Sequence, residues 1–261
     1  MSIHKTAIIE GDVKIHEGVE IGPNVIIRGN VEIQEGTKIQ AGVIIEGNVK
    51  IGKNNTIFPY ATLGFVPQDY AYKKEESWVI IGDNNTIREY VNIHRATGKG
   101  KATEIGNNNY IMGFVHIAHN VKIGSNVIIV NSAGLAGYVE VEDNAYISGL
   151  VGVHQFVRIG AYSIVGGVSA VAQDVPPYVL VRGVPASVYG LNLVGLRRKG
   201  FSNERIRDIK GAFRILYQKG YPTEKALLEI KKSYPDNNDI KHFVEFIEHS
   251  KRGIIKRVGS K

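Results

Sequence analysis

The stretch Ile105–Lys122, IGNNNYIMGFVHIAHNVK, decides the fold, because it consists of three six-residue units that each open on isoleucine. The units begin at Ile105, Ile111 and Ile117. A spacing of six drifts around a helix instead of keeping to one stripe, whereas it fits the two-residue alternation of a strand. Short strands joined by tight corners are therefore predicted here.

The same repeat covers most of the chain. Counted from Ile3 in steps of six, with two interruptions, 26 units open on Ile, Leu or Val, and the last begins at Val171. Gly and Asn cluster between the apolar positions, as in Gly124-Ser125-Asn126, and tolerate the backbone of a tight corner. Such strands cannot bury an apolar face alone, but stacked coils share one core. A solenoid of parallel strands is predicted over residues 1–189.

This pattern resembles that of the hexapeptide-repeat acyltransferase superfamily. The resemblance implies a left-handed parallel β-helix in which three units form one triangular coil. Residues 18 apart are then expected to stack on neighbouring coils.

After Val171 the repeat gives way to prolines and glycines, and then to a helical period. Ser202 is predicted to cap a first helix and Thr223 a second, while Asp239 is predicted to start a third. We expect a small α-helical domain over residues 190–261, packed on the end of the solenoid.

Two segments interrupt the repeat: residues 69–80, DYAYKKEESWVI, and residues 99–104, KGKATE. Loops that leave a rigid scaffold often carry binding residues. The first is long and holds the only tryptophan, Trp78, so we expect it to serve the site. For the second, a functional role and a tolerated decoration have equal weight.

The amino-acid composition excludes several kinds of site and reaction. The 261 residues include no cysteine, which excludes disulfides, zinc–thiolate sites and thiol nucleophiles. No apolar run approaches the roughly 18 residues that a membrane span needs. We therefore expect a cytoplasmic protein with no stable membrane insertion.

The net charge of +7 is uneven. From Gly190 onward, 17 Lys and Arg stand against 8 Asp and Glu, a net of +9, while the remainder holds 15 against 17, a net of −2. A basic C-terminal part indicates an acidic partner: nucleic acid, anionic membrane, a phosphate-bearing substrate or an acidic protein. Solvated lysines on helices are the alternative.

Among the eight histidines, none of which occupies an apolar repeat position, His119 has the most informative neighbours. The 18-residue stacking places Gly137 over it, Tyr138 over Asn120, and His154 over Ala136. A neutral imidazole beside open space can accept a proton from a hydroxyl near pH 7. The Gly137 N–H is placed to stabilise an oxyanion in the same space. Because a prism face is flat, a neighbouring copy is expected to complete the cleft.

The segments HIAHN, LAGYV, VHQF, AQDVPPY and GLRRKGF resemble those of the UDP-N-acetylglucosamine O-acyltransferases that begin lipid A synthesis. The resemblance spans the whole chain and implies a homotrimer. It further implies transfer of a 3-hydroxyacyl chain from acyl carrier protein to the sugar's 3-position, with His119 as general base and the Gly137 N–H as oxyanion donor. The implied substrate contacts are Asp69, His116, His154, Gln155, Asn192 and Arg198, and the implied acyl-chain contacts are Gln68, Met112 and Gly167.

Three residues depart from the family pattern. Tyr138 stands where histidine is frequent, Asn120 where aspartate is common, and Val194 where an acidic residue is frequent. Tyr138 is a candidate partner of the base through its phenol, and Asn120 removes a negative charge beside it.

The predicted partners are UDP-N-acetylglucosamine, or its 3-amino analogue, and acyl carrier protein, which the basic C-terminal helices would receive. No cofactor, metal or nucleic acid is expected. Without cysteine or an activated serine, direct attack of the acceptor on the thioester is the simplest scheme. The related N-acyltransferase of the pathway carries an additional N-terminal domain, for which repeats starting at Ile3 leave no room.

Two alternatives remain at this stage. A γ-class carbonic anhydrase uses the same prism with histidines as metal ligands, and His116, His119 and His154 are candidates for that role. A non-catalytic trimeric scaffold is the other, and it predicts that His119 is dispensable.

Overall fold

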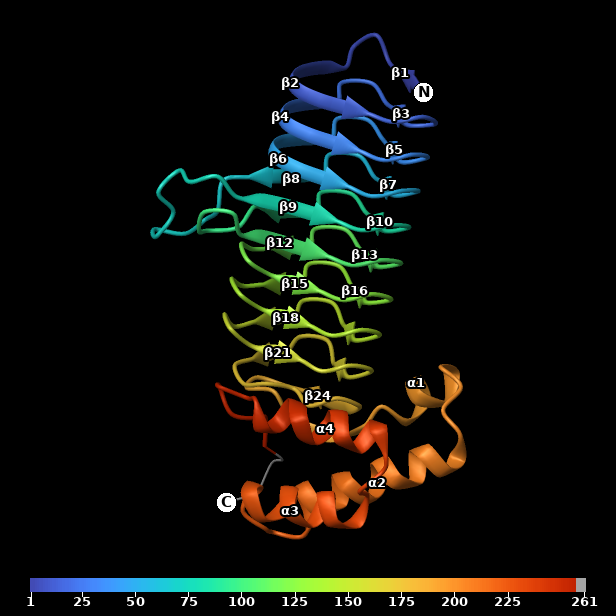
Figure 1. Cartoon of the computed structure of the whole chain (residues 1–261), viewed down its shortest axis with the longest axis vertical. Helices are drawn as coiled ribbons and strands as arrows, with labels where there is room; N and C mark the ends of the chain where they lie inside the picture. Colours follow the sequence, from blue (N-terminus) through green and yellow to red (C-terminus); the bar gives the residue numbers. More distant parts are fainter. Residues whose placement is uncertain (257–261) are drawn as a thin grey trace.

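The computed structural model describes residues 1–256 and confirms the predicted fold class, a parallel β-solenoid followed by helices. Coils stack along one axis, and four helices gather at the end where the chain finishes (Figure 1). Residues 257–261 of the expected helical domain lie outside the described part.

Most strands are only two residues long, because each lies between two corners. In chain order they are β1 (Ser2–Ile3), β2 (Ile8–Ile15), β3 (Glu20–Ile21), β4 (Ile26–Ile33), β5 (Lys38–Ile39), β6 (Ile44–Ile51), β7 (Thr56–Ile57), β8 (Thr62–Phe65), β9 (Trp78–Ile81), β10 (Thr86–Ile87), β11 (Asn92–His94), β12 (Ala102–Ile105), β13 (Tyr110–Ile111), β14 (His116–Ile117), β15 (Lys122–Ile123), β16 (Ile128–Ile129), β17 (Gly134–Leu135), β18 (Glu140–Val141), β19 (Tyr146–Ile147), β20 (Gly152–Val153), β21 (Arg158–Ile159), β22 (Ile164–Val165), β23 (Ala170–Val171), β24 (Val179–Arg182) and β25 (Ser187–Leu191).

The strands form three faces. One face is the stack that starts at β1, passes through β13 and ends at β24, and β25 pairs antiparallel with β24. The other two diverge from the long strand β6: β8, β11, β14, β17, β20 and β23 form one, and β9, β12, β15, β18 and β21 form the other. Where the long strands turn between these two faces, a Cβ on Gly29 would lie 2.5 Å from the carbonyl oxygen of Gly47, so the stacked coils require glycine there.

The stacking follows the expected 18-residue register beyond the interruptions. His116 pairs with Gly134 and Ile117 with Leu135, and the next coil continues with Val153. From Ile21 to Val171, the aliphatic residue that opens each unit is buried, so one apolar column runs along the solenoid. The close packing of this column makes the outer residues a rigid lattice.

The two interruptions begin and end earlier than expected. Residues 66–77 connect β8 to β9, and residues 95–101 connect β11 to β12. Trp78 pairs with Asn48 of β6, and Ala102 pairs with Trp78 in turn. Strands β9 and β12 thus take up the last residues of the expected ranges 69–80 and 99–104, while β8 and β11 end a few residues before those ranges begin.

The helices are α1 (Leu193–Arg198), α2 (Asn203–Gln218), α3 (Thr223–Ser233) and α4 (Asn238–Glu248). Ser202 caps α2 as predicted, accepting from the Arg205 N–H. The other starts shift by one residue: Pro222 precedes α3 without a side-chain cap, and the Asn237 side chain caps α4. The short helix α1 was not predicted. The expected domain boundary at 189/190 falls within β25.

The helical part is fixed to the last coils by partly buried polar contacts. The Asp174 carboxylate accepts from the Arg158 N–H at 2.8 Å and from the Ser250 hydroxyl at 2.6 Å. The Arg158 guanidinium lies 4.2 Å from the centre of the Phe246 ring in α4, and His242 contacts Glu142 at 3.0 Å. None of the helices within residues 1–256 has the length and apolar character that crossing a membrane requires.

Candidate active site

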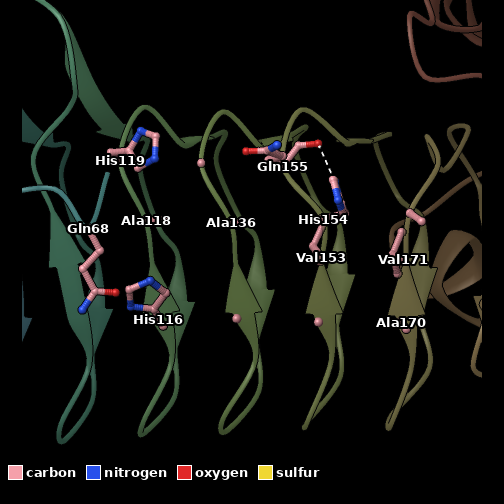
Figure 2. Close-up of a pocket in the computed structure, with 14 residues that line it drawn as sticks. Gln68, His116, Ala118, His119, Ala136, Val153, His154, Gln155, Ala170 and Val171 are labelled. Atoms are coloured by element: carbon pink, nitrogen blue, oxygen red, sulfur yellow. Dashed lines mark hydrogen bonds between the residues drawn. The ribbon is translucent and has the colours of Figure 1, made fainter. Parts of the chain in front are cut away.

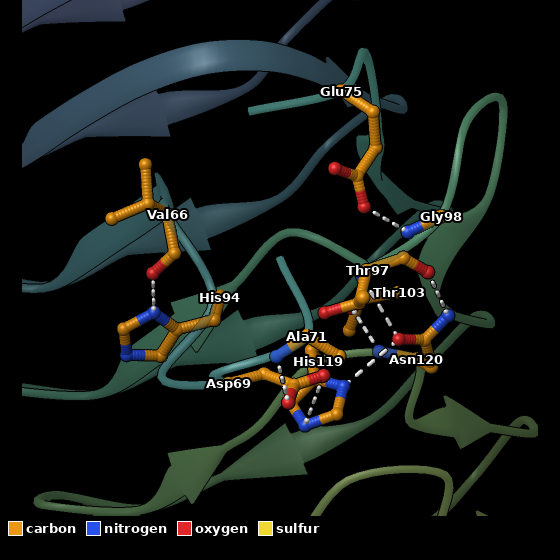
Figure 3. Close-up of polar contacts among 10 residues, drawn as sticks. All are labelled: Val66, Asp69, Ala71, Glu75, His94, Thr97, Gly98, Thr103, His119 and Asn120. Carbon is orange, nitrogen blue, oxygen red and sulfur yellow. Dashed lines mark hydrogen bonds and ion pairs between the residues drawn. The ribbon is translucent and has the colours of Figure 1, made fainter. Parts of the chain in front are cut away.

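The site lies along one corner of the solenoid, between the β14 face and the β15 face. Both inserted loops leave the solenoid at this corner. One connects β8 to β9, and the other connects β11 to β12 on the next coil. His119 occupies the same corner on the next coil, between β14 and β15. The loop at 66–77 therefore lies beside His119 because consecutive coils stack, although residues 78–118 separate the two in the sequence (Figure 3).

His119 is nearly buried, with 9% of its surface exposed. A Cβ on Gly137 would lie 2.5 Å from both Cε1 and Nε2 of the imidazole, so only glycine fits at that position. Within residues 1–256 the Gly137 N–H donates no hydrogen bond. On the coil next to His119, the Gly137 N–H is therefore free of acceptors from residues 1–256.

The Nδ1 side of His119 contacts the Asn120 amide oxygen at 2.9 Å. That amide is itself held by the backbone of Thr97 in the second loop, whose N–H donates to Oδ1 and whose carbonyl accepts from Nδ2. The second loop also holds the first loop in place, because the Glu75 carboxylate of the first loop accepts from the Gly98 N–H of the second (Figure 3). The residue 95–101 loop is therefore a structural support for the site.

The Nε2 side of His119 faces Asp69 of the first loop, with 3.7 Å between Nε2 and Oδ2. This distance is too long for a hydrogen bond and short enough for strong charge interaction. The Ala71 backbone N–H, which donates to Oδ1, holds the pKa of the Asp69 carboxyl below its usual value, and His119 adds to that effect. Asp69 is therefore a carboxylate at neutral pH, placed to stabilise an imidazolium.

Two further histidines lie on the same face. Burial lowers the pKa of His116, and the neighbouring His94 and His119 lower it further. Burial also lowers the pKa of His94, whose Nδ1 donates to the Val66 carbonyl. His116 contacts the Asn92 amide oxygen through Nδ1 at 2.9 Å. At neutral pH both are uncharged, so a substrate meets a polar surface without fixed positive charge there.

A groove of about 640 Å³ runs from His116 over four coils of this face (Figure 2). Its floor is made of small residues, because the outward positions on successive coils are Gly134, Gly152 and Ala170. The predicted site residues that line it are Gln68, His116, His119, Gly137, His154 and Gln155. The Gln68 side chain lies beside His116, and the His119 ring points along the groove.

Other predicted residues lie outside this groove. Asn192 is buried at the start of α1, where its side chain accepts from the Gly195 N–H and donates to the Tyr162 carbonyl. Arg198, at the end of α1, is exposed. Met112 and Gly167 lie toward the other edge of the β14 face, near the corner between it and the β13 face.

Tyr138 contacts His119 through its ring. The ring centres are 5.3 Å apart with perpendicular planes, and Phe156 stacks on the far side of Tyr138 at 4.8 Å. The hydrogen-bond partner of the His119 Nδ1 is Asn120 and not the phenol. Tyr138 therefore packs against the imidazole.

Sequence reasoning did not identify Thr97 or Asn92 as contacts of the candidate site. Both act through hydrogen bonds to an amide or an imidazole whose position depends on coil stacking. Asn92 lies 24 residues before His116, and an inserted loop alters the 18-residue arithmetic between them. Only the observed register brings them together.

Two family profiles match the chain. The profile described as "Bacterial transferase hexapeptide (six repeats)" matches residues 102–137, and the one described as "Udp N-acetylglucosamine O-acyltransferase; Domain 2" matches residues 174–255. A Thermodesulfovibrio yellowstonii protein named acyl-(acyl-carrier-protein)–UDP-N-acetylglucosamine O-acyltransferase is 53% identical over 255 residues, 97% of this chain and 99% of the relative. The protein of that name from Paraburkholderia phymatum is 49% identical over 259 residues, with the same coverage.

The chain belongs to the UDP-N-acetylglucosamine O-acyltransferase family. The structure of the Francisella novicida UDP-N-acetylglucosamine acyltransferase matches with a TM-score of 0.96 and 43% identity, covering 99% of this chain and 95% of that one. The Acinetobacter baumannii structure matches at 0.94 and 40%, covering 97% and 99%. The predicted membership of this O-acyltransferase family is confirmed.

Proposed function

We propose that this acyltransferase moves a 3-hydroxyacyl chain from acyl carrier protein to the 3-position of UDP-N-acetylglucosamine, the first step of lipid A synthesis. The proposal places the reaction in the cytoplasm and requires no cofactor beyond the phosphopantetheine of the carrier. It rests on the family, in which close relatives bear this name, and on one observation in the structure.

That observation is the close approach of His119 and Gly137, which both line the groove. The 3-hydroxyl of the sugar would donate its proton to the imidazole while its oxygen attacks the thioester carbonyl carbon. The Gly137 N–H, free of other acceptors in the described residues, would donate to the oxyanion. Collapse then breaks the carbon–sulfur bond, and the leaving thiolate takes the proton from His119, giving the ester and the carrier thiol.

The groove supplies positions for both substrates. His116, His154 and Gln155 line it and are proposed to contact the nucleotide sugar, with Asp69 reaching the sugar beside His119. The acyl group is proposed to pass directly from one substrate to the other, without an enzyme-bound intermediate. Holding the two substrates in line would then supply much of the rate enhancement. Gln68, at the start of the groove, is proposed to contact the acyl chain.

A homotrimer is proposed, because one edge of the grooved face is uncovered. Along the corner beside β13 and β14, large apolar side chains are exposed on all but one of six coils, where Ser132 stands between Phe114 and Leu150: they are Tyr60, Tyr90, Phe114, Leu150 and Val168. Three of them form a stack, with ring centres 5.4 and 4.9 Å apart. A row of this kind marks an interaction surface, and three copies around one axis would cover it and give each groove a second wall.

The remaining predicted residues acquire roles only in that assembly. Met112 and Gly167 lie near the uncovered corner, where an acyl chain between two copies would contact them. Asn192 and Arg198 lie at the C-terminal end, where they are proposed to hold the phosphate-bearing part of a substrate. The basic helical part is proposed to receive the acidic carrier protein.

The test is a transfer assay with a panel of 3-hydroxyacyl carrier proteins against UDP-N-acetylglucosamine and its 3-amino analogue. We expect one acyl length and one acceptor to dominate, and we expect His119→Ala to abolish transfer while nucleotide-sugar binding is retained. Failure of every pair would remove the proposed function. Full transfer activity of His119→Ala would remove His119 as the base, and absence of transfer by wild type and variant alike would favour the scaffold. Stoichiometric zinc or cobalt in the purified protein would favour a carbonic-anhydrase-like metalloenzyme.

A further inference from the structure

The hydrogen bonds around Asn120 determine which way its amide points. The Thr97 N–H donates to Oδ1 at 2.9 Å, and Nδ2 donates to the Thr97 carbonyl at 3.0 Å. A flipped amide would put two donors together and two acceptors together, so the backbone of Thr97 selects one orientation. The N–H of Asn120 is fixed as well, because it donates to the buried Thr103 hydroxyl at 2.9 Å.

This orientation has a consequence for His119. Its Nδ1 lies 2.9 Å from the amide oxygen, which can only accept, so a neutral imidazole must carry its proton on Nδ1. The lone pair is then on Nε2, the atom that a Cβ on Gly137 would overlap and that faces Asp69. Nε2 points toward Asp69, whereas Nδ1 points toward Asn120 (Figure 3). In the proposed reaction the acceptor hydroxyl therefore meets Nε2.

We propose that Asn120 is a positioning residue that holds neutral His119 in the Nδ1–H tautomer, and that the Thr97 backbone makes this position specific for an amide. The inference rests on the proposed function for its kinetic consequence, but the tautomer itself is independent of any activity. Asn120 does not line the groove and is 9% exposed, so it acts through His119 and not on the substrate.

Specificity for an amide follows from the Thr97 carbonyl. In a carboxylate at position 120, an oxygen would replace Nδ2 and lie about 3 Å from that carbonyl oxygen, without a proton between them. The pair is buried, so water is excluded and an uncompensated contact of two acceptors is costly. An aspartate could not occupy this place without moving the 95–101 loop, which also anchors Glu75 of the first loop.

The test combines nitrogen-15 NMR of the histidines with kinetics of the full-length protein. The shifts of imidazole nitrogens distinguish a protonated from a bare nitrogen, and the His119 signals are assigned by their loss in His119→Gln. At a pH where the imidazole is neutral, we expect Nδ1 protonated and Nε2 bare in the wild type. In Asn120→Leu, which keeps the shape and removes the acceptor, we expect the Nε2–H tautomer to become populated.

In the same variant kcat should fall by about tenfold to a hundredfold, with the KM for the nucleotide sugar unchanged, because one buried hydrogen bond to the base is lost. Asn126→Leu is the matched control, since Asn126 has the same backbone (φ of 59° against 60°) on an exposed corner away from the groove. Asn120→Asp should lower the melting temperature and not exceed the wild-type rate.

A bare Nδ1 in the wild type overturns the proposal. So does an Asn120→Leu variant that is no slower than Asn126→Leu, or an Asn120→Asp variant as stable and active as the wild type. If Asn120→Leu does not fold, the wild-type spectrum and Asn120→Asp still decide. Failure of the proposed function has a different signature: wild-type protein with the expected tautomer and no transfer activity.

Discussion

Gly137 and His119, on neighbouring coils, are so close that a single methyl group on Gly137 would overlap the Nε2 and Cε1 atoms of the imidazole. The contact brings the proposed base next to a backbone N–H that donates to no acceptor within residues 1–256. It requires glycine, because a side chain at position 137 would occupy the place of the imidazole.

Gly137→Ala tests that relationship. The new methyl group must push the imidazole aside, and a displacement of about 1 Å at a reacting group costs on the order of a hundredfold in rate. We therefore expect kcat to fall about a hundredfold while the protein remains folded. Gly190→Ala is the control, because a Cβ at Gly190 meets no atom within 4 Å. Equal activity of the two variants would contradict the proposed role of Gly137.

The solenoid and the pair His119–Gly137 were predictable from the sequence because both follow from a fixed period. Ile117 and Leu135 are 18 residues apart and pair as expected. Contacts made across the two insertions were not predictable, since loop length breaks the period: the approach of Asp69 to Nε2 is one example.

The hydrogen bonds of the Thr97 backbone could not be predicted from the sequence either, because the residues around a threonine do not show what its backbone will contact. The helix starts at Thr223 and Asp239 were misplaced by one residue for a similar reason. Pro222 and Asn237 stand just before the predicted starts, and helix boundaries shift by a residue or two between neighbouring candidates of this kind.

Asp69→Asn is expected to lower kcat. The Ala71 N–H holds the pKa of the Asp69 carboxyl below its usual value, and the carboxylate lies 3.7 Å from Nε2, where its charge would stabilise the imidazolium that forms when the imidazole takes the hydroxyl proton. Asparagine keeps the size of the side chain and removes that charge, so we expect kcat at neutral pH to fall by roughly tenfold. A kcat equal to that of the wild type would show that Asp69 does not act on His119.

The contact of His242 in α4 with Glu142 predicts a pH-dependent attachment of the helical part. The Glu142 hydrogen bond raises the pKa of His242 above its ordinary value near 6.5. Its contribution to the unfolding free energy is therefore complete below pH 6.5 and is lost as the pH rises through the folded-state pKa. Because the His242 side chain is 40% exposed, we expect less than about 1 kcal/mol.

Denaturant unfolding of wild type and His242→Gln at several pH values measures this contribution. The difference between the two should shrink as the pH rises above 6.5, because the wild type then loses the charge as well. His4→Gln, on an exposed turn at the far end of the solenoid, serves as control. A difference that grows with pH would contradict the assignment of the charge to His242.

Leu150→Lys tests whether the uncovered apolar corner holds the proposed trimer together. In a single chain the Leu150 side chain is 64% exposed, so a lysine there leaves the coil intact. In an assembly the same lysine would bury an unpaired charge, which interfaces do not tolerate at their centre. Light scattering after size exclusion should therefore show a smaller species, and transfer activity should fall with it, since each groove loses its second wall.

Asn126→Lys is the matched substitution for this last test. Asn126 has nearly the same backbone as Leu150, with φ of 59° against 57°, and it lies on a different, polar corner of the prism. The strain of placing lysine in that backbone is thus equal in the two variants, and only the contact surface differs. A trimer that persists in Leu150→Lys, or one that dissociates equally in Asn126→Lys, would show that another face mediates assembly and that the groove is completed differently.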